Sequence, residues 1–319
     1  MPLFRLTRRP VGLAAASLAL TLFSAAPAVS VAPPLSAPHV LAHLDLAAGQ
    51  MPENIVLEPD GSADVTFISA RQIARIGLDG HTTVLATLPA PAVPATPLVG
   101  FAAVTGIARA DDGTLYVNYA TGTDDLTGVW RLTPGGVPER IAALPANGLP
   151  NGLTLDRQRG NLYVADSLLG TVWRISLHDG TRTAWATGTE LKPNGFIGAN
   201  GIRKHHGAIW VTNTDNGTIL RIPICPDGSA APIETRATGL AGIDDFGFTG
   251  ESDDLLAALN SANEVVHLPQ GGTPTVVLTG QDGLSNPTSV AVCGDTVYVT
   301  SAAFTTMQDP NLLLARYNA

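Results

Sequence analysis

Between Asn151 and Ile175 the chain reads NGLTLDRQRGNLYVADSLLGTVWRI, and the rest of the sequence varies this one pattern. Apolar and polar residues alternate in its segments NGLTLD, NLYVAD and TVWRI, which polar or glycine-containing loops separate. Alternation with a period of two residues is typical of β-strands rather than helices. A fourth strand is expected at 182–186, after a turn at 178–180. A single four-stranded unit of this kind cannot bury both of its faces, so it requires neighbours.

The same order of segments recurs five more times along the chain. For example, ENIVL is followed by ADVTFIS, and NGIR is followed by AIWVTN. The first residues of successive units are 44 to 52 positions apart. Six four-stranded repeats of this length predict an all-β protein, a six-bladed β-propeller whose blades surround a central channel. A β-sandwich would give no reason for one strand pattern to occur six times.

The sixth unit reaches Ala319 after only three strands. The segment 39–47, HVLAHLDLA, resembles the fourth strands of other units, such as TVLATLP and ERIAALP. We expect this segment to complete the last blade, because closing the ring in this way removes two exposed strand edges. The expected propeller therefore spans residues 39–319, and residues 29–38 are interpreted as a linker that precedes it.

Residues 1–28 have the pattern of an export signal. Arg5, Arg8 and Arg9 precede the apolar stretch 11–23, and small residues follow as far as Ala28. The apolar stretch is too short to span a membrane. We expect cleavage near Ala28, after export by the general secretory route or, given the adjacent arginines, the twin-arginine route. The mature protein is then secreted, without membrane attachment.

Composition limits the partners that the protein can have. The net charge is −9, with 18 basic and 27 acidic residues, so no basic face is expected for nucleic acid. The expected partner is a small-molecule substrate. A monomeric state is expected because the repeat closes on itself. Cys225 and Cys293 map to turns of blades four and six, with blade five between them. Since a disulfide needs Cα atoms within about 7 Å, we predict two free thiols.

The first strand of each blade should line the channel, and its first residue should lie at the channel mouth on one face. Aligning the six units places these residues in one ring: Glu53, Thr105, Asn151, Asn200, Asp244 and Thr288. Any one such polar residue at a strand start is ordinary turn chemistry. Four carboxylates and amides in a shared register are harder to explain in that way. Ca²⁺ prefers oxygen ligands, and the ring has no Cys or His for zinc or copper. We therefore predict that Ca²⁺, or another divalent cation, binds Glu53, Asn151, Asn200 and Asp244.

The same register carries a resemblance to a known family. The motifs PENIVLEPDG (52–61), LPNGLTLD (149–156) and GANGI (198–202) resemble those of the gluconolactonase and senescence-marker lactonase family. Paraoxonase and diisopropylfluorophosphatase are related six-bladed calcium hydrolases. The resemblance extends over essentially the whole mature chain and implies that Glu53, Asn151 and Asp244 hold a catalytic divalent cation, with Asn200 as an additional ligand.

The sequence departs from this family at two points. Sugar-lactone members commonly place a substrate-binding Asn, preceded by an Arg, where this chain has Val104 and Thr105. This difference argues against gluconolactone as substrate. The fifth blade reads Ile-Asp244-Asp245, closer to the Asp-Asn pair of paraoxonase-like members than to the Pro-Asp-Gly common in lactonases.

The chemistry implied is metal-assisted hydrolysis of a lactone or related ester, in which the cation polarises the carbonyl group. Asp244 or Asp245 is the candidate base that takes a proton from the attacking water. The sequence contains no G-x-S-x-G nucleophile motif. Two alternatives stay open: a non-catalytic binding module with a structural ion, and a metal-free enzyme similar to strictosidine synthase.

The expected pocket wall comes from loops on the same face as the ring. These loops are the insertion 90–104 and the segments 118–125, 166–169, 213–216 and 260–263. The candidate substrate-pocket residues are Phe101, Thr105, Asp166, Asp215 and Thr288, although a loop Asp more often caps a turn. The pair His205-His206 maps to a turn on the opposite face and is interpreted as a solvated turn.

Overall fold

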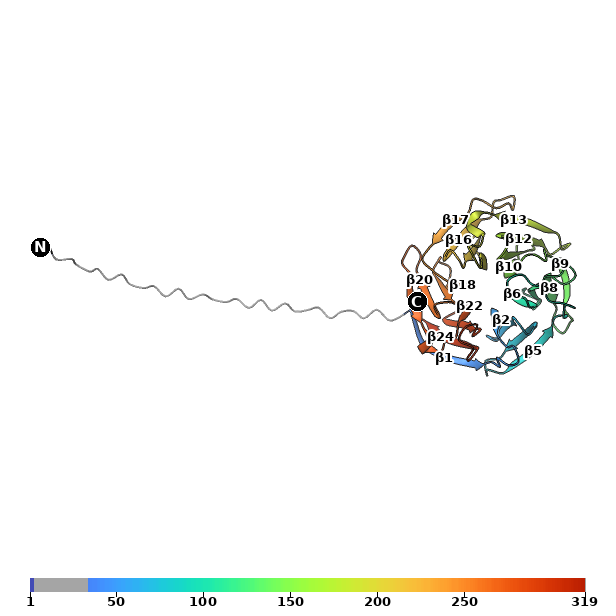
Figure 1. The fold of residues 1–319 in the computed structure, drawn as a ribbon, viewed down its shortest axis with the longest axis horizontal. Coiled ribbons are helices and arrows are strands. Elements are labelled where there is room, and N and C mark those ends of the chain that lie inside the picture. Colours follow the sequence, from blue (N-terminus) through green and yellow to red (C-terminus); the bar gives the residue numbers. More distant parts are fainter. Residues whose placement is uncertain (3–33, 319) are drawn as a thin grey trace. The chain divides into compact units, whose positions relative to one another are not determined.

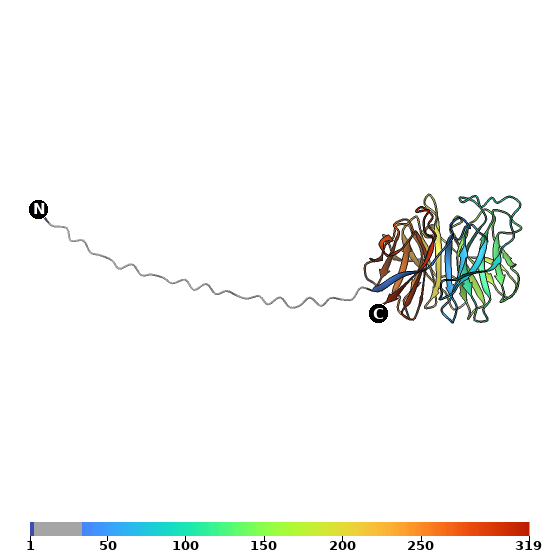
Figure 2. The same cartoon turned by 90° about the horizontal axis from the view of Figure 1, so that it is seen from below.

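The computed structural model describes residues 1–2 and 34–318. The predicted export signal, except its first two residues, and residues 29–33 of the predicted linker lie outside these residues. Six four-stranded antiparallel sheets are arranged as blades around a central channel, so the predicted six-bladed β-propeller is confirmed (Figure 1). Seen from the side, the strands run between the two faces of a disc (Figure 2). No helix among the described residues is long and apolar enough to cross a membrane.

Each blade except the last consists of four strands that are consecutive in the chain. Blade one contains β2 (Pro52–Leu57), β3 (Ala63–Phe67), β4 (Gln72–Ile76) and β5 (Thr82–Thr87). Blade two contains β6 (Ala103–Arg109), β7 (Leu115–Ala120), β8 (Gly128–Leu132) and β9 (Glu139–Ala143). Blade three contains β10 (Pro150–Asp156), β11 (Asn161–Asp166), β12 (Thr171–Ser176) and β13 (Arg182–Thr187).

Blades four and five follow the same order, and each is accompanied by one turn of 3₁₀ helix. Blade four contains β14 (Ala199–His205), β15 (Ala208–Asn213), β16 (Thr218–Pro223) and β17 (Glu234–Ala237), preceded by η1 (Thr189–Leu191). Blade five contains β18 (Ile243–Phe248), β19 (Leu255–Leu259), β20 (Glu264–Leu268) and β21 (Thr275–Leu278), followed by η2 (Gly280–Asp282).

Blade six joins the two ends of the propeller. Its strands β22 (Pro287–Cys293), β23 (Thr296–Ser301) and β24 (Asn311–Tyr317) are completed by β1 (Leu35–His43), which pairs antiparallel with β24 (Figure 1). The closing strand was therefore correctly predicted, but its bounds were not. β1 begins at Leu35, inside the segment interpreted as linker, and it ends at His43 rather than at residue 47.

The earlier start of β1 has a local cause. The ladder is interrupted between Ser36 and His39, and Ala37 has a positive φ of 49°. This irregularity accommodates Pro38, which has no N–H to donate, in an edge strand. Leu35 beyond it is buried in a cluster with Leu313. Burial of an apolar side chain contributes about 1.5–3 kcal/mol, which favours continuing the strand past the irregularity.

The apolar core lies between adjacent blades. One cluster, for example, joins Tyr163 and Trp185 of blade three to Ile202 and Val211 of blade four. Trp185 packs edge-on against Tyr163, with their ring centroids 4.9 Å apart. Each sheet thus buries both faces against its neighbours, which is the requirement that the isolated repeat could not meet. Cys225 and Cys293 are both free, as predicted.

Candidate metal centre

The six ring residues all lie near the start of an inner strand. Each is the second residue of its strand, except Thr105, which is the third residue of β6. All six inner strands have a register shift against their neighbours at this position, for example between Ala199 and Ile202 in β14. Such bulges reorient side chains and are common next to active sites. Here they allow two consecutive residues of one strand to reach the channel.

Glycines in three of these strands allow the blades to approach closely. A Cβ atom at Gly152 would lie 2.4 Å from the carbonyl oxygen of Asn200, and one at Gly106 would lie 2.3 Å from that of Asn151. A Cβ atom at Gly201 would lie equally close to the Asp245 carboxylate of β18. The Asn-Gly pairs are therefore parts of strands that need a residue without a side chain, and not turns. The arrangement brings the backbones of the ring residues together.

The four predicted metal ligands form a buried, oxygen-rich group at the channel mouth. Asn200 donates through Nδ2 to Asp244 Oδ1 at 2.8 Å, and to Thr214 Oγ1 at 3.0 Å. Asn151 donates through Nδ2 to Ser167 Oγ at 3.3 Å. Because both amide nitrogens are used in this way, the two amide carbonyl oxygens remain available as ligands.

The two carboxylates of this group lack compensating charge. Among the described residues, Glu53 Oε2 is buried without a hydrogen-bond partner. Burial, followed by repulsion from Asp245, raises the pKa of Glu53 to about 8. Burial also raises the pKa of Asp244, with further contributions from Glu53 and Asp245 that the hydrogen bond from Asn200 partly offsets. Two such carboxylates require protons or a cation, so the donor set fits a hard divalent ion.

Asp245 lies one residue further along the same strand and has a different environment. Its carboxylate accepts hydrogen bonds from Asn54 Nδ2 at 2.9 Å, Ser289 Oγ at 2.7 Å and the Phe246 backbone N–H at 2.8 Å. The Arg203 guanidinium also donates to it and forms an ion pair. These four donors fix the orientation of the Asp245 carboxylate and occupy its oxygen atoms. Of the two candidate bases, Asp244 is therefore the better placed.

A cavity of about 550 Å³ opens over the ring. The four predicted metal ligands line this cavity. Its lining also includes Thr105, Phe101 and Asp215. Asp245 and Thr288 do not. Thr288 is fully buried and donates to the Pro52 carbonyl oxygen at 2.8 Å, which ties blade six to blade one. Thr288 therefore does not line this cavity, to which the sequence analysis assigned it.

The two loop aspartates have structural roles. Asp166 is fully buried and accepts hydrogen bonds from the backbone N–H groups of Leu149, Leu168 and Leu169. It therefore does not line the cavity, in contrast to the prediction. Asp215 lines the cavity, but its carboxylate accepts from the backbone N–H groups of 194, 196 and 197. It fixes the loop between blades three and four over the mouth.

The rest of the wall is only partly as predicted. The insertion contributes Val99 and Phe101, and the segments 213–216 and 260–263 also line the cavity. The segments 118–125 and 166–169 do not. Instead, Phe196 and Phe304 line the cavity from two loops outside the predicted wall segments. These loops follow no strand periodicity, and only the lone aromatic residue in each could have indicated a wall position.

No protein-family model and no curated protein matches the chain. Solved structures do share its fold. A gluconolactonase from Xanthomonas campestris is 15% identical, with a TM-score of 0.61 over 92% of this chain and 99% of the other. Regucalcin, a calcium-binding protein from Agrobacterium tumefaciens, is 17% identical, with a TM-score of 0.62 over 87% and 93%. The fold is that of gluconolactonase-type and regucalcin-type propellers.

The fold alone does not decide the reaction. The PQQ-bound aldose sugar dehydrogenase from Streptomyces coelicolor has a TM-score of 0.63 to this chain, with 16% identity, over 90% of this chain and 100% of the other. A propeller of this shape can therefore carry different chemistries. Any statement on function has to come from the ring residues and the cavity above them.

Proposed function

We propose that this protein is a metal-dependent hydrolase of lactones or related esters. The single observation that supports this most is the pair of buried carboxylates, Glu53 and Asp244, which face one cavity together with two amides. Glu53, Asn151, Asn200 and Asp244 would hold a divalent cation, for which Ca²⁺ is the best match to an all-oxygen donor set. A cation bound there supplies Lewis-acid polarisation of the substrate carbonyl and stabilisation of the oxyanion.

The residues of the chain have separate tasks in this proposal. Asp244 lines the cavity and accepts a proton from the attacking water, while its bond from Asn200 fixes the carboxylate orientation. The ion pair between Asp245 and Arg203 joins β18, which carries Asp244, to β14. The loops above the mouth exclude bulk water from the reacting groups, which strengthens the electrostatic interactions inside.

The cavity wall bears on the class of substrate. Phe101, Phe196 and Phe304 come from three different loops and line the space above the ring. The hydroxyl of Thr105 donates to the Pro150 carbonyl oxygen at 2.8 Å, so it is not free to recognise a sugar hydroxyl. These features favour a lactone or ester with an apolar substituent over a polyhydroxylated sugar lactone.

The setting of this activity is also part of the proposal. We infer an exported, monomeric enzyme that acts on a small molecule, with neither nucleic acid nor membrane as partner. The support for export is the N-terminal sequence pattern. The support for a monomer is the closed ring, in which the first and last strands of the propeller pair with each other.

Hydrolysis of γ- and δ-lactones, aryl esters and a phosphotriester, with and without EDTA, tests the proposal. Activity should disappear on chelation, return with Ca²⁺, and fall at least about 100-fold in Glu53→Gln and Asp244→Asn. Glu139→Gln makes the same chemical change on an outer strand, where Glu139 pairs with Arg131, and should leave activity unchanged. Ca²⁺ binding without turnover of any substrate would instead indicate a structural ion in a binding module.

A further inference from the structure

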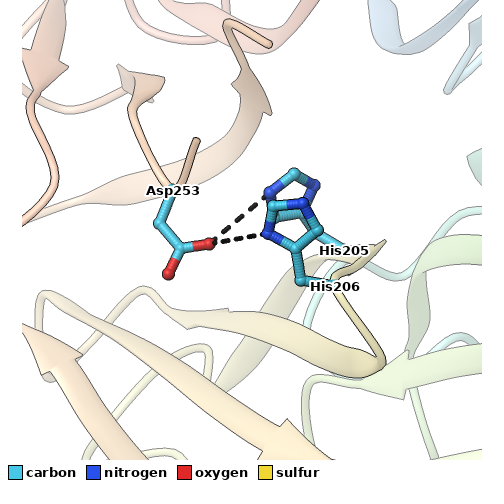
Figure 3. A group of neighbouring side chains, drawn as sticks. All are labelled: His205, His206 and Asp253. Atoms are coloured by element: carbon cyan, nitrogen blue, oxygen red, sulfur yellow. Dashed lines mark hydrogen bonds and ion pairs between the residues drawn. The ribbon is translucent and has the colours of Figure 1, made fainter. Parts of the chain in front are cut away.

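A second group of potential metal ligands lies on the face opposite to the ring. Asn200 is near the start of β14, whereas His205 is its last residue, so the turn that follows β14 lies at the far face. His205 and His206 occupy this turn of blade four. Asp253 lies in the corresponding turn of blade five, between β18 and β19. Figure 3 shows both imidazole rings directed at the Asp253 carboxylate.

The separations between Asp253 and each of the two histidines match the edges of a coordination polyhedron. Asp253 Oδ1 is 3.5 Å from His205 Nε2 and 3.4 Å from His206 Nδ1. One nitrogen or oxygen atom from each residue lies within 4.8 Å of the others. A tetrahedral zinc ion with bonds of about 2.0–2.1 Å holds its ligand atoms about 3.3 Å apart. Direct ion-pair hydrogen bonds are shorter, at about 2.7–2.9 Å. The spacing therefore fits ligands around an ion better than a closed ion pair.

The surroundings hold the group in position. The His205 ring stacks on Phe248, with centroids 3.8 Å apart and planes 14° from parallel. The side chains of His205 and Asp253 are only 13% and 18% exposed. Burial and the neighbouring His206 lower the pKa of His205, which favours the neutral imidazole that binds metals. His205 Nε2 also lies 3.0 Å from the Ser252 carbonyl oxygen, an interaction that a bound metal would replace.

We propose that His205, His206 and Asp253 form a Zn²⁺ site that joins blades four and five. Two imidazoles and one carboxylate are a donor set that zinc accepts, and water can take the fourth position. The Glu251 carboxylate is 3.8 Å from His206 Nε2, and its side chain is fully exposed to solvent. The ring at the other face has only oxygen donors, so the two sites select different metals. This proposal does not depend on hydrolase activity.

Calorimetric titration of the purified protein with Zn²⁺, in the presence of excess Ca²⁺ to occupy the ring, tests this proposal. One equivalent of Zn²⁺ should bind. His205→Phe keeps the ring stack on Phe248 but removes the ligand nitrogen, and Asp253→Asn removes the charge. Each should weaken Zn²⁺ binding by more than the roughly 10- to 100-fold that loss of an outer partner costs.

The control is His81→Phe, which changes an exposed histidine in the turn between β4 and β5 and should leave Zn²⁺ affinity unchanged. Co²⁺ provides a second readout, because a tetrahedral Co²⁺ site absorbs visible light and the two ligand variants should lose this absorption. The proposal is overturned if the wild-type protein binds no Zn²⁺, or if His205→Phe and Asp253→Asn bind it as tightly as wild type. Circular dichroism verifies that both variants are folded.

Discussion

The Arg203 guanidinium, on β14 of blade four, forms an ion pair with the Asp245 carboxylate, on β18 of blade five. Asp245 is 1% exposed and Arg203 is 20% exposed, so the pair is shielded from water. Removing one partner of a buried pair leaves an uncompensated charge. Arg203→Met should therefore lower the free energy of unfolding by about 3–5 kcal/mol, as measured by urea denaturation.

The matched control for this prediction is Arg131→Met, which breaks the exposed pair between Arg131 and Glu139. This variant should lose less than about 1 kcal/mol, because exposed ion pairs contribute little. Equal losses in both variants would mean that Asp245 is adequately held by Asn54 and Ser289 alone.

The close approach of inner strands makes Gly152 sensitive to the smallest substitution. A Cβ atom there would lie 2.4 Å from the Asn200 carbonyl oxygen, so Gly152→Ala must displace a predicted metal ligand. We expect a loss of about 1–3 kcal/mol in stability, together with weaker Ca²⁺ binding. Gly250→Ala is the control, since a Cβ atom at Gly250 meets no atom within 4 Å. Unchanged Ca²⁺ affinity in Gly152→Ala would argue against the ring as the metal site.

The raised pKa of Glu53 predicts how the metal-free protein responds to pH. A carboxyl group with a pKa of about 8 when folded and near 4.5 when unfolded binds more protons in the folded state between these values. Its contribution to stability is thus complete below about pH 4.5 and is lost as pH rises through 8. Denaturation of EDTA-treated protein should show this loss, and Glu53→Gln should reduce the slope over the same range. A wild-type slope no steeper than that of Glu53→Gln would contradict the prediction.

The aromatic wall predicts substrate preference in the proposed hydrolase. Phe196 is 54% exposed and lines the cavity, so Phe196→Ala should raise KM for lactones with an apolar substituent by about 10-fold. Its effect on unsubstituted lactones should be small. Val137→Ala alters an apolar side chain that is 82% exposed in the turn between β8 and β9, outside the cavity lining, and should change neither KM. If kcat instead falls equally with all substrates, Phe196 affects the proposed metal centre and does not recognise the apolar substituent.

The ring could be predicted from sequence because each of its residues opens a repeat unit, so alignment of the repeats places them at one level of the channel. The role of Asp245 could not be predicted in this way. Its partners Asn54, Arg203 and Ser289 come from three other inner strands, and only the bulges bring consecutive residues of β18 into the channel together. Strand alternation alone would have directed Asp245 away from the axis.

The pocket wall and the second metal group show a different limit. Phe196 and Phe304 lie in irregular loops whose course depends on backbone contacts such as those that Asp215 makes with residues 194–197. His205-His206 was correctly placed in a turn on the far face. The approach of Asp253 depends on the angle between adjacent blades, which the repeat pattern does not specify.

Pairing of β1 with β24 also affects the order of folding. During synthesis, blades one to five can form in succession, since their strands are consecutive in the chain. The sixth sheet cannot be completed until Asn311–Tyr317 has left the ribosome and met Leu35–His43. Until then, the nascent chain presents unpaired strand edges, which favour association with other chains. Delaying folding until the whole chain is available, as a translocation route for unfolded chains does, would remove this hazard.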